Sequence, residues 1–162
     1  MTTRSYDRLN CPIAHSLAVL GDQWTLLILR DSLFGLSRFE EFQGSLGISR
    51  NLLTRRLRAM VAEGLLERRP VRSGGRRSEY IPTEKAKDLL PVLLALGQWR
   101  ERWEPSPAGP RVIPTEFGTG RPVAVRLVPR GDTRGVRPAD VVIRPGPGAD
   151  ATLRARLTEP RS

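Results

Sequence analysis

The chain has few of the residues that most catalytic and metal sites require. Its 162 residues include one cysteine, Cys11, and one histidine, His15. A single cysteine excludes an intramolecular disulfide and favours a reducing compartment. The sequence also has no glycine-rich phosphate loop, no metal-ligand cluster, and no nucleophile accompanied by a base and an orienting group. It therefore predicts a protein that is not an enzyme and holds no metal or other cofactor.

Long apolar runs are also missing. Charged and polar residues interrupt the start of the chain (Arg4, Asp7, Arg8 and Asn10), so no signal peptide is predicted. No run reaches the length needed to cross a membrane. We therefore expect a cytoplasmic protein without a membrane partner, long enough for one well-cored domain and an appendage.

Positive charge, by contrast, is abundant and concentrated in one part of the chain. The formal net charge is +10, and residues 50–77 alone carry nine arginines against two glutamates, a net of +7. The rest of residues 1–104 has a net charge of −2. Because arginines that neutralise phosphates release counterions, this distribution favours a polyanionic partner. The alternative is an arginine-rich face that is merely solvated.

Residues 49–63 are predicted to form an amphipathic helix, with Ser49 as N-cap and Gly64 as its stop. At 100° per residue, one side is an apolar stripe formed by Leu53, Leu57, Met60 and Val61. Another side groups residues that can hydrogen-bond base edges and phosphates, namely Asn51, Thr54, Arg55 and Arg58. This pattern is typical of a recognition helix.

The flanking segments complete a winged helix. An apolar helix over 24–30 and a shorter helix over 37–42, capped by Ser37, precede the glycine-containing turn 44–47. Two helices joined by such a turn indicate a helix-turn-helix. Strand-like runs at 66–71 and 78–81 bracket the basic segment 72–77, which predicts a β-hairpin wing over about 66–82. The expected fold class is mainly α (α+β).

Several linked blocks of this sequence match one known family. They are Cys11-Pro12-Ile13, 21–29, 39–42, Ile48-Ser49, 53–57, 63–66, Glu79-Tyr80, Thr83 and 90–99. On these blocks, residues 11–103 resemble the HxlR-type family of bacterial winged-helix transcription regulators, which are relatives of the MarR group. The resemblance implies a homodimer that binds double-stranded DNA at a pseudo-palindromic operator. We expect a repressor that occludes promoter DNA.

Specific DNA contacts follow from this interpretation. We expect base-edge and nearby phosphate contacts from Asn51, Thr54, Arg55 and Arg58, and backbone-positioning contacts from Arg38, Ser49 and Arg50. From the wing, Arg72, Arg76 and Arg77 are expected to contact phosphates or the minor groove. RNA is the weaker alternative, because no aromatic stacking platform is visible. A winged helix that docks on proteins is the other alternative.

The segments at either end of this domain are apolar helices. Residues 83–103 are apolar over much of the helix circumference, and Pro91 either kinks this helix or starts a new one. Residues 10–20 present a second apolar face. The two helices either pack on each other within one chain or form the dimer interface, and the resemblance implies the dimer.

Cys11 lies beside Pro12, at a predicted helix start where the helix dipole favours a thiolate, and His15 follows on the same face. The cysteine is either a sensor thiol or a small buried residue in an interface. Some members of the resembled family sense oxidants through a matching cysteine. An oxidant or a small molecule is therefore an open option for the effector.

The last part of the chain, 105–162, has ten prolines and seven glycines and a net charge of +5. Runs at 122–128 and 140–143 are β-like, which predicts a small β-hairpin followed by a disordered end from about Pro145. This extension either adds DNA affinity, binds a partner or has no function. We expect an arm at 1–10, the winged helix at 11–104 and the extension at 105–162.

Overall fold

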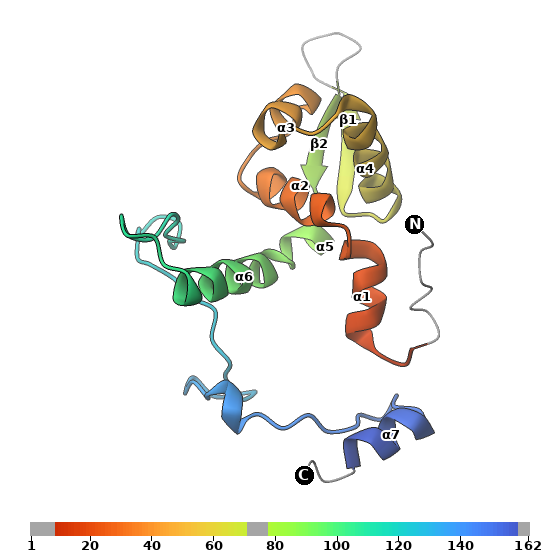
Figure 1. The fold of residues 1–162 in the computed structure, drawn as a ribbon, viewed down its shortest axis with the longest axis vertical. Helices are drawn as coiled ribbons and strands as arrows, with labels where there is room; N and C mark the ends of the chain where they lie inside the picture. The colour runs from red at the N-terminus through yellow and green to blue at the C-terminus, as the bar shows by residue number, and fades with distance from the viewer. Residues whose placement is uncertain (1–8, 71–77, 159–162) are drawn as a thin grey trace. The chain divides into compact units, whose positions relative to one another are not determined.

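The computed structural model describes residues 9–70 and 78–158, which form helices and one two-stranded antiparallel sheet (Figure 1). The elements in chain order are α1 Pro12–Leu20, α2 Gln23–Leu33, α3 Phe39–Leu46, α4 Arg50–Ala62, β1 Leu66–Pro70, β2 Ser78–Pro82, α5 Glu84–Lys87, α6 Leu90–Trp103, a 3-10 helix Pro138–Asp140 and α7 Ala151–Thr158. Two compact units are present. One is Val19–Val125, and the other combines the described residues up to Ala18 with those from Arg126 onward. The prediction of a mainly helical fold with a β-hairpin is confirmed.

Side-chain caps define where the helices of the helix-turn-helix begin. The Asp22 carboxylate accepts a hydrogen bond from the backbone N–H of Trp24 at 3.0 Å and so starts α2. The Glu41 carboxylate reaches back to the backbone N–H groups of Ser37 and Arg38, at 2.9 Å each. Arg38 is therefore the N-cap of α3, one residue later than the predicted Ser37.

Helix α4 has the predicted boundaries. The Ser49 hydroxyl accepts from the backbone N–H of Leu52, which satisfies a donor of the first turn. The helix ends at Ala62, and Gly64 has a φ of +69°, a left-handed backbone conformation that residues other than glycine rarely adopt. The following residue, Leu65, is already buried in the core.

The core of the larger unit lies among α2, α3, α4 and the start of the hairpin. Ten buried side chains form it, namely Ile28, Leu29, Phe42, Ile48, Leu53, Leu57, Met60, Leu65, Leu66 and Ala86. Leu53, Leu57 and Met60 belong to the predicted apolar stripe of α4, because residues spaced three and four apart share one face of a helix, and the fourth stripe residue, Val61, is partly buried against this core. Burying this stripe turns the opposite, polar faces of α4 outward.

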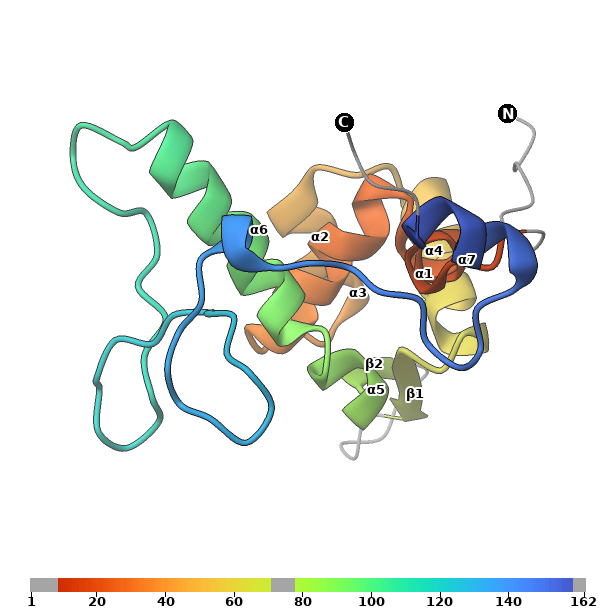
Figure 2. The same cartoon turned by 90° about the horizontal axis from the view of Figure 1, so that it is seen from below.

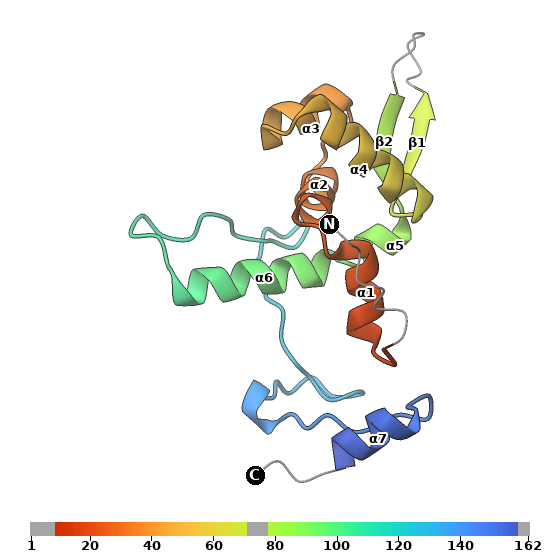
Figure 3. The same cartoon turned by 45° about the vertical axis from the view of Figure 1, so that its right-hand side comes forward.

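The predicted wing is a hairpin of β1 and β2, which lies beside α4 (Figure 3). Leu66 pairs with Pro82 and Arg68 with Tyr80. The tip, with Arg72, Arg76 and Arg77, lies outside the described residues.

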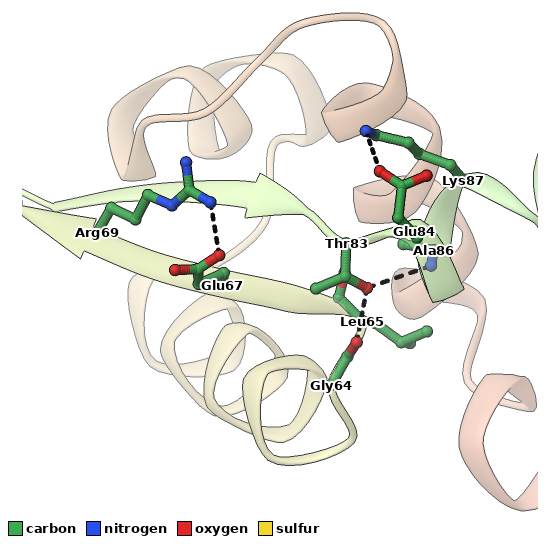
Figure 4. Close-up of polar contacts among 8 residues, drawn as sticks. All are labelled: Gly64, Leu65, Glu67, Arg69, Thr83, Glu84, Ala86 and Lys87. Carbon is green, nitrogen blue, oxygen red and sulfur yellow. Dashed lines mark hydrogen bonds and ion pairs between the residues drawn. The ribbon is translucent and has the colours of Figure 1, made fainter.

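The base of the hairpin is fastened to the end of α4. The Thr83 hydroxyl donates to the carbonyl oxygen of Gly64 at 2.7 Å and accepts from the backbone N–H of Ala86 (Figure 4). One side chain thus joins the exit of α4 to the first turn of α5.

Beyond the hairpin, Pro91 lies in the first turn of a separate helix, α6, which resolves the choice between a kink and a new helix. Helix α6 contacts α2 (Figure 2). Its outer side leaves Trp99 and Trp103 exposed, at 62% and 67%. The Gln98 side chain makes two hydrogen bonds with the backbone of Val125, which holds part of the extension on α6.

The extension differs from its predicted structure. Residues 122–128 and 140–143 form no strands, and among the described residues the backbone pairs there only at isolated bridges, Thr115 with Pro122 and Leu127 with Val136. The many prolines lack the N–H donors that a continuous ladder requires. A helix, α7, occupies 151–158, where the sequence predicted a disordered end. In the part of the chain that is described, no helix is long and apolar enough to cross a membrane.

Candidate nucleic-acid interface

One exposed side of α4 forms a ridge of polar and small residues. Asn51 and Arg55 are four residues apart, and Ala59 and Ala62 continue the same side of the helix. All four side chains are exposed. We call this set the α4 crest. Its two alanines leave the end of the ridge without bulk, so a flat or grooved partner can approach the helix closely.

A second side of α4, on which Arg50 and Arg58 are also exposed, lines an open groove. Arg50, Thr54 and Arg58 follow each other at four-residue spacing and line a cavity of about 370 Å³. Its other lining residues are Phe39, Val61, Arg68 and Tyr80. We call this cavity the basic groove. The structure therefore divides the four predicted base-contacting residues between two sides of α4: Asn51 and Arg55 on the crest, Thr54 and Arg58 in the groove.

Arg68 reaches the groove because side chains alternate along a strand. Leu66, two residues earlier on β1, points into the core, so Arg68 lies on the same face and Glu67 and Arg69 lie on the other. Its Nε donates to the Ser78 hydroxyl at 3.0 Å, across the hairpin. Arg68 was not among the predicted DNA-contacting residues, although the alternation that starts from the apolar Leu66 indicates its direction.

Contacts within the groove orient Arg50 and engage the Thr54 hydroxyl. The Arg50 guanidinium lies over the Phe39 ring, 4.9 Å from its centroid. The Thr54 hydroxyl donates to the carbonyl oxygen of Arg50 at 2.8 Å, so its one donor is already used. None of the ion pairs between described residues includes Arg50, Arg55 or Arg58.

Carboxylates appear at the neighbouring end of the groove. An adjoining cavity of about 500 Å³ shares Arg50 and Arg68 and is also lined by Arg38, Glu40 and Glu41. The Arg38 Nε lies 3.6 Å from a Glu79 carboxylate oxygen. Hydrogen bonds from the backbone N–H groups of Ser37 and Arg38 lower the pKa of Glu41, so this carboxylate stays charged. Of the predicted backbone-positioning residues, Arg38 is thus the one paired with an acid.

Arg56, which also belongs to α4, has a different role from its neighbours. Its guanidinium lies 2.6 Å from the Asp22 carboxylate, and both side chains are about one-third exposed, at 32% and 30%. The same Asp22 caps α2 through its other carboxylate oxygen. This ion pair fixes α4 against the start of α2 and was not anticipated from the sequence.

Cys11 lies immediately before the first residue of α1 and is partly buried. Its carbonyl oxygen accepts from the backbone N–H of His15 at 3.1 Å, the first hydrogen bond of that helix. Among the described residues, no group of three or more His, Cys, Asp or Glu side chains is placed to hold a metal ion.

The helix-turn-helix of α3 and α4, followed by the β1–β2 wing, matches a known family. Residues 19–107 fit the model described as the HxlR-like helix-turn-helix. The chain belongs to this family. An uncharacterized HTH-type transcriptional regulator of Mycobacterium tuberculosis is 36% identical over 141 residues, which are 87% of this chain and 89% of that protein. This HxlR-like protein is thus a DNA-binding transcription regulator of the helix-turn-helix type.

Solved structures extend the similarity beyond the DNA-binding domain. PA1607 has a TM-score of 0.76 at 39% sequence identity, over 86% of this chain and 97% of that chain. PA1374 from Pseudomonas aeruginosa has a TM-score of 0.62 at 43% identity, over 91% of this chain and 100% of that chain. Both similarities are too long to stop at residue 104, so they include part of the extension. The redox regulator HypR in its oxidized form covers 57% of this chain and 96% of its own, with a TM-score of 0.52 at 30% identity.

Proposed function

We propose that this HxlR-like regulator is a homodimeric repressor that binds a pseudo-palindromic operator and occludes promoter DNA. The observation that carries the proposal is the position of α4. Its apolar stripe is buried, and the α4 crest stands exposed beside three guanidinium groups in the basic groove. A helix with this arrangement fits a major groove, where side chains reach base edges and neighbouring arginines reach phosphates. The proposal involves no catalytic step.

The proposed base contacts lie on the α4 crest. Asn51 supports bidentate hydrogen bonding to adenine, and Arg55 to guanine. Ser49 and Arg50, at the start of α4, are proposed to bind phosphates, where the positive end of the helix dipole adds to the attraction. Arg72, Arg76 and Arg77 remain the proposed wing contacts.

The proposed dimer uses the apolar helices at the two ends of the winged helix. Ile13 and Leu17 on α1 are exposed at 72% and 47%, and Leu96, Trp99 and Trp103 on α6 at 49%, 62% and 67%. Large apolar side chains exposed along helices of a small domain are typical of a protein interface. A second copy of the chain fits because a two-fold axis would place two α4 helices on successive turns of a palindrome.

The test is fluorescence-anisotropy binding of the full chain to a duplex that it enriches from a random pool, beside a scrambled duplex, across a salt series. We expect tighter binding to the enriched duplex at every salt concentration, with two chains bound per duplex. Arg55→Ala should reduce the preference by about 1–3 kcal/mol if it removes a bidentate base contact. Equal affinity of the wild type for both duplexes would contradict sequence-specific repression.

The dimer is tested separately by sedimentation velocity. The wild type should sediment as a dimer, and Trp99→Ala should raise the dimer dissociation constant by more than about tenfold, as expected when a central aromatic side chain is removed. A wild type that remains monomeric at micromolar concentration would contradict the proposed dimer.

We also propose that Cys11 is the residue through which an oxidant would act. Support comes from its partial exposure at the start of α1 and from the similarity to the redox regulator HypR. Hydrogen peroxide should weaken DNA binding of the wild type and leave Cys11→Ser unaffected. An equal response of the two proteins would reject Cys11 as the sensor.

A further inference from the structure

We infer that the basic groove binds the sugar-phosphate backbone of one DNA strand, and that Arg58 and Arg68 are phosphate-binding residues that position α4 without reading sequence. The inference rests on the proposed function and assigns DNA recognition to two surfaces. The α4 crest reads the bases, and the groove between α4 and the hairpin sets the register of the protein on the duplex.

The basic groove gathers positive charge. Three guanidinium groups from two elements, Arg50 and Arg58 on α4 and Arg68 on β1, line one cavity whose other lining residues include no carboxylate. Like charges gathered in one hollow repel each other, so an anion in that hollow is strongly favoured. Guanidinium groups bind phosphate oxygens through two parallel hydrogen bonds. Tyr80 lines the same cavity.

Two of the three groove arginines are already oriented by contacts within the protein. Arg68 is held by the Ser78 hydroxyl at 3.0 Å, and Arg50 lies on the Phe39 ring at 4.9 Å. A side chain that is already oriented loses less conformational entropy when it binds. These two arginines are therefore arranged to accept an anion that arrives in a fixed position.

Shape decides between phosphate and base. The base edges lie at the floor of the DNA groove, so a side chain that reaches them must extend beyond the surface around it. Asn51 and Arg55 are exposed and line neither cavity, which leaves them free to do so. Arg58 and Arg68 line a hollow between a helix and a hairpin. The sugar-phosphate backbone is the raised ridge between the major and minor grooves, and a ridge fits a hollow. The carboxylates of Glu40 and Glu41 in the adjoining cavity limit how far that ridge can extend toward Arg38.

The experiment compares Arg58→Gln and Arg68→Gln with a matched control, Arg69→Gln, in the 162-residue chain. Arg69 is the next residue on the same strand, points to the opposite face and is paired with Glu67 at 2.7 Å (Figure 4). Affinities are measured on the enriched and the scrambled duplex across a salt series. Far-UV circular dichroism melts show whether each variant is folded.

We expect Arg58→Gln and Arg68→Gln to weaken binding to both duplexes by the same factor, roughly tenfold to a hundredfold. Each should lower the slope of log K against log salt by about one, because one phosphate contact is lost. Arg68→Lys should retain the salt slope, since its charge remains. Arg69→Gln should bind as the wild type does.

Three results would overturn the inference. If Arg68→Gln binds no worse than Arg69→Gln while the wild type still prefers the enriched duplex, the groove does not contact DNA and the proposed function stands. A loss confined to the enriched duplex in Arg58→Gln would make Arg58 a base-reading residue. A wild type that binds neither duplex even at low salt would reject the proposed function together with the groove.

Discussion

The winged helix and the extension contain similar apolar residues, but only the winged helix buries them. In the winged helix, Ile28 and Leu29 on α2 are fully buried, at 0% exposure. In the extension, Val142 and Ile143 are exposed at 73% and 64%, and the described part of the extension has no buried residue. Apolar composition therefore does not by itself produce a core.

The difference comes from hydrogen bonding of the backbone. Helices α2, α3 and α4 satisfy their own backbone groups, so their apolar faces can be buried together at low cost. In the extension, ten prolines among 58 residues remove donors and fix φ, and isolated bridges replace a ladder. Without regular elements, its apolar side chains have no common face to bury.

The largest predicted effect is on the free energy of unfolding, when one apolar side chain is truncated in each of the two regions. Leu57→Ala removes a fully buried side chain from α4 and should lower the free energy of unfolding by about 2–5 kcal/mol, since it leaves a cavity in the core. Val142→Ala should change it by less than about 0.5 kcal/mol. Urea unfolding followed by circular dichroism measures both.

A destabilisation by Val142→Ala as large as that by Leu57→Ala would contradict this difference between the two regions, because it would show that the extension contributes to the same cooperative unit as the core. Ile143→Ala serves as a second variant in the same exposed run.

A smaller effect is predicted where the extension is fastened to α6. The Gln98 side chain accepts from the backbone N–H of Val125 at 2.6 Å and donates to its carbonyl oxygen at 3.3 Å. Gln98→Ala should free this segment and speed tryptic cleavage after Arg126 by about fivefold, because each exposed hydrogen bond contributes about 0.5–1.5 kcal/mol. The melting temperature of the winged helix should stay the same.

Gln98→Glu sharpens this prediction, because a carboxylate still accepts from the Val125 N–H but cannot donate to its carbonyl. Its cleavage rate should lie between those of the wild type and Gln98→Ala. An unchanged rate in Gln98→Ala would show that the segment is held by other contacts.

The smallest predicted effect is on the pH dependence of the melting temperature. It concerns two carboxylates, one in each region, that have a lowered pKa. The pKa of Glu41 is lowered by hydrogen bonds from the backbone of Ser37 and Arg38, and that of Asp140 by a hydrogen bond from the Arg137 side chain. A pKa lowered by folding contributes stability above the unfolded pKa, and this stability is lost as pH falls through the folded pKa.

Glu41→Gln should therefore lower the melting temperature at pH 7, and the difference from wild type should fade below about pH 4. Because solvent screens Glu41, we expect the free energy of unfolding at pH 7 to fall by only a fraction of about 1 kcal/mol. Asp140→Asn should leave the melt of the winged helix unchanged at any pH. Thermal melts at several pH values test both, and a constant effect of Glu41→Gln across pH would contradict the assignment.

Much of the winged helix followed from local pattern. The 3.6-residue spacing of Leu53, Leu57 and Met60 gave the buried face of α4, and Ser49 and Gly64 gave its ends. Strand-like runs on either side of the basic segment gave the hairpin. Ser37 failed as a cap because the side chain of Glu41, four residues later, decided the start of α3. The extension was mispredicted because β-like residues indicate strands only when a neighbouring segment can pair with them.

The sequence by itself determined the helix-turn-helix, the wing and the concentration of arginine in both, because these depend on spacing and composition along one segment. Only the tertiary structure decided where each arginine lies and what it contacts. Arg55 lies on the α4 crest, Arg58 and Arg68 meet in the basic groove, and Arg56 pairs with Asp22. Those arginines are chemically identical, so their roles depend on which neighbours the fold brings beside them.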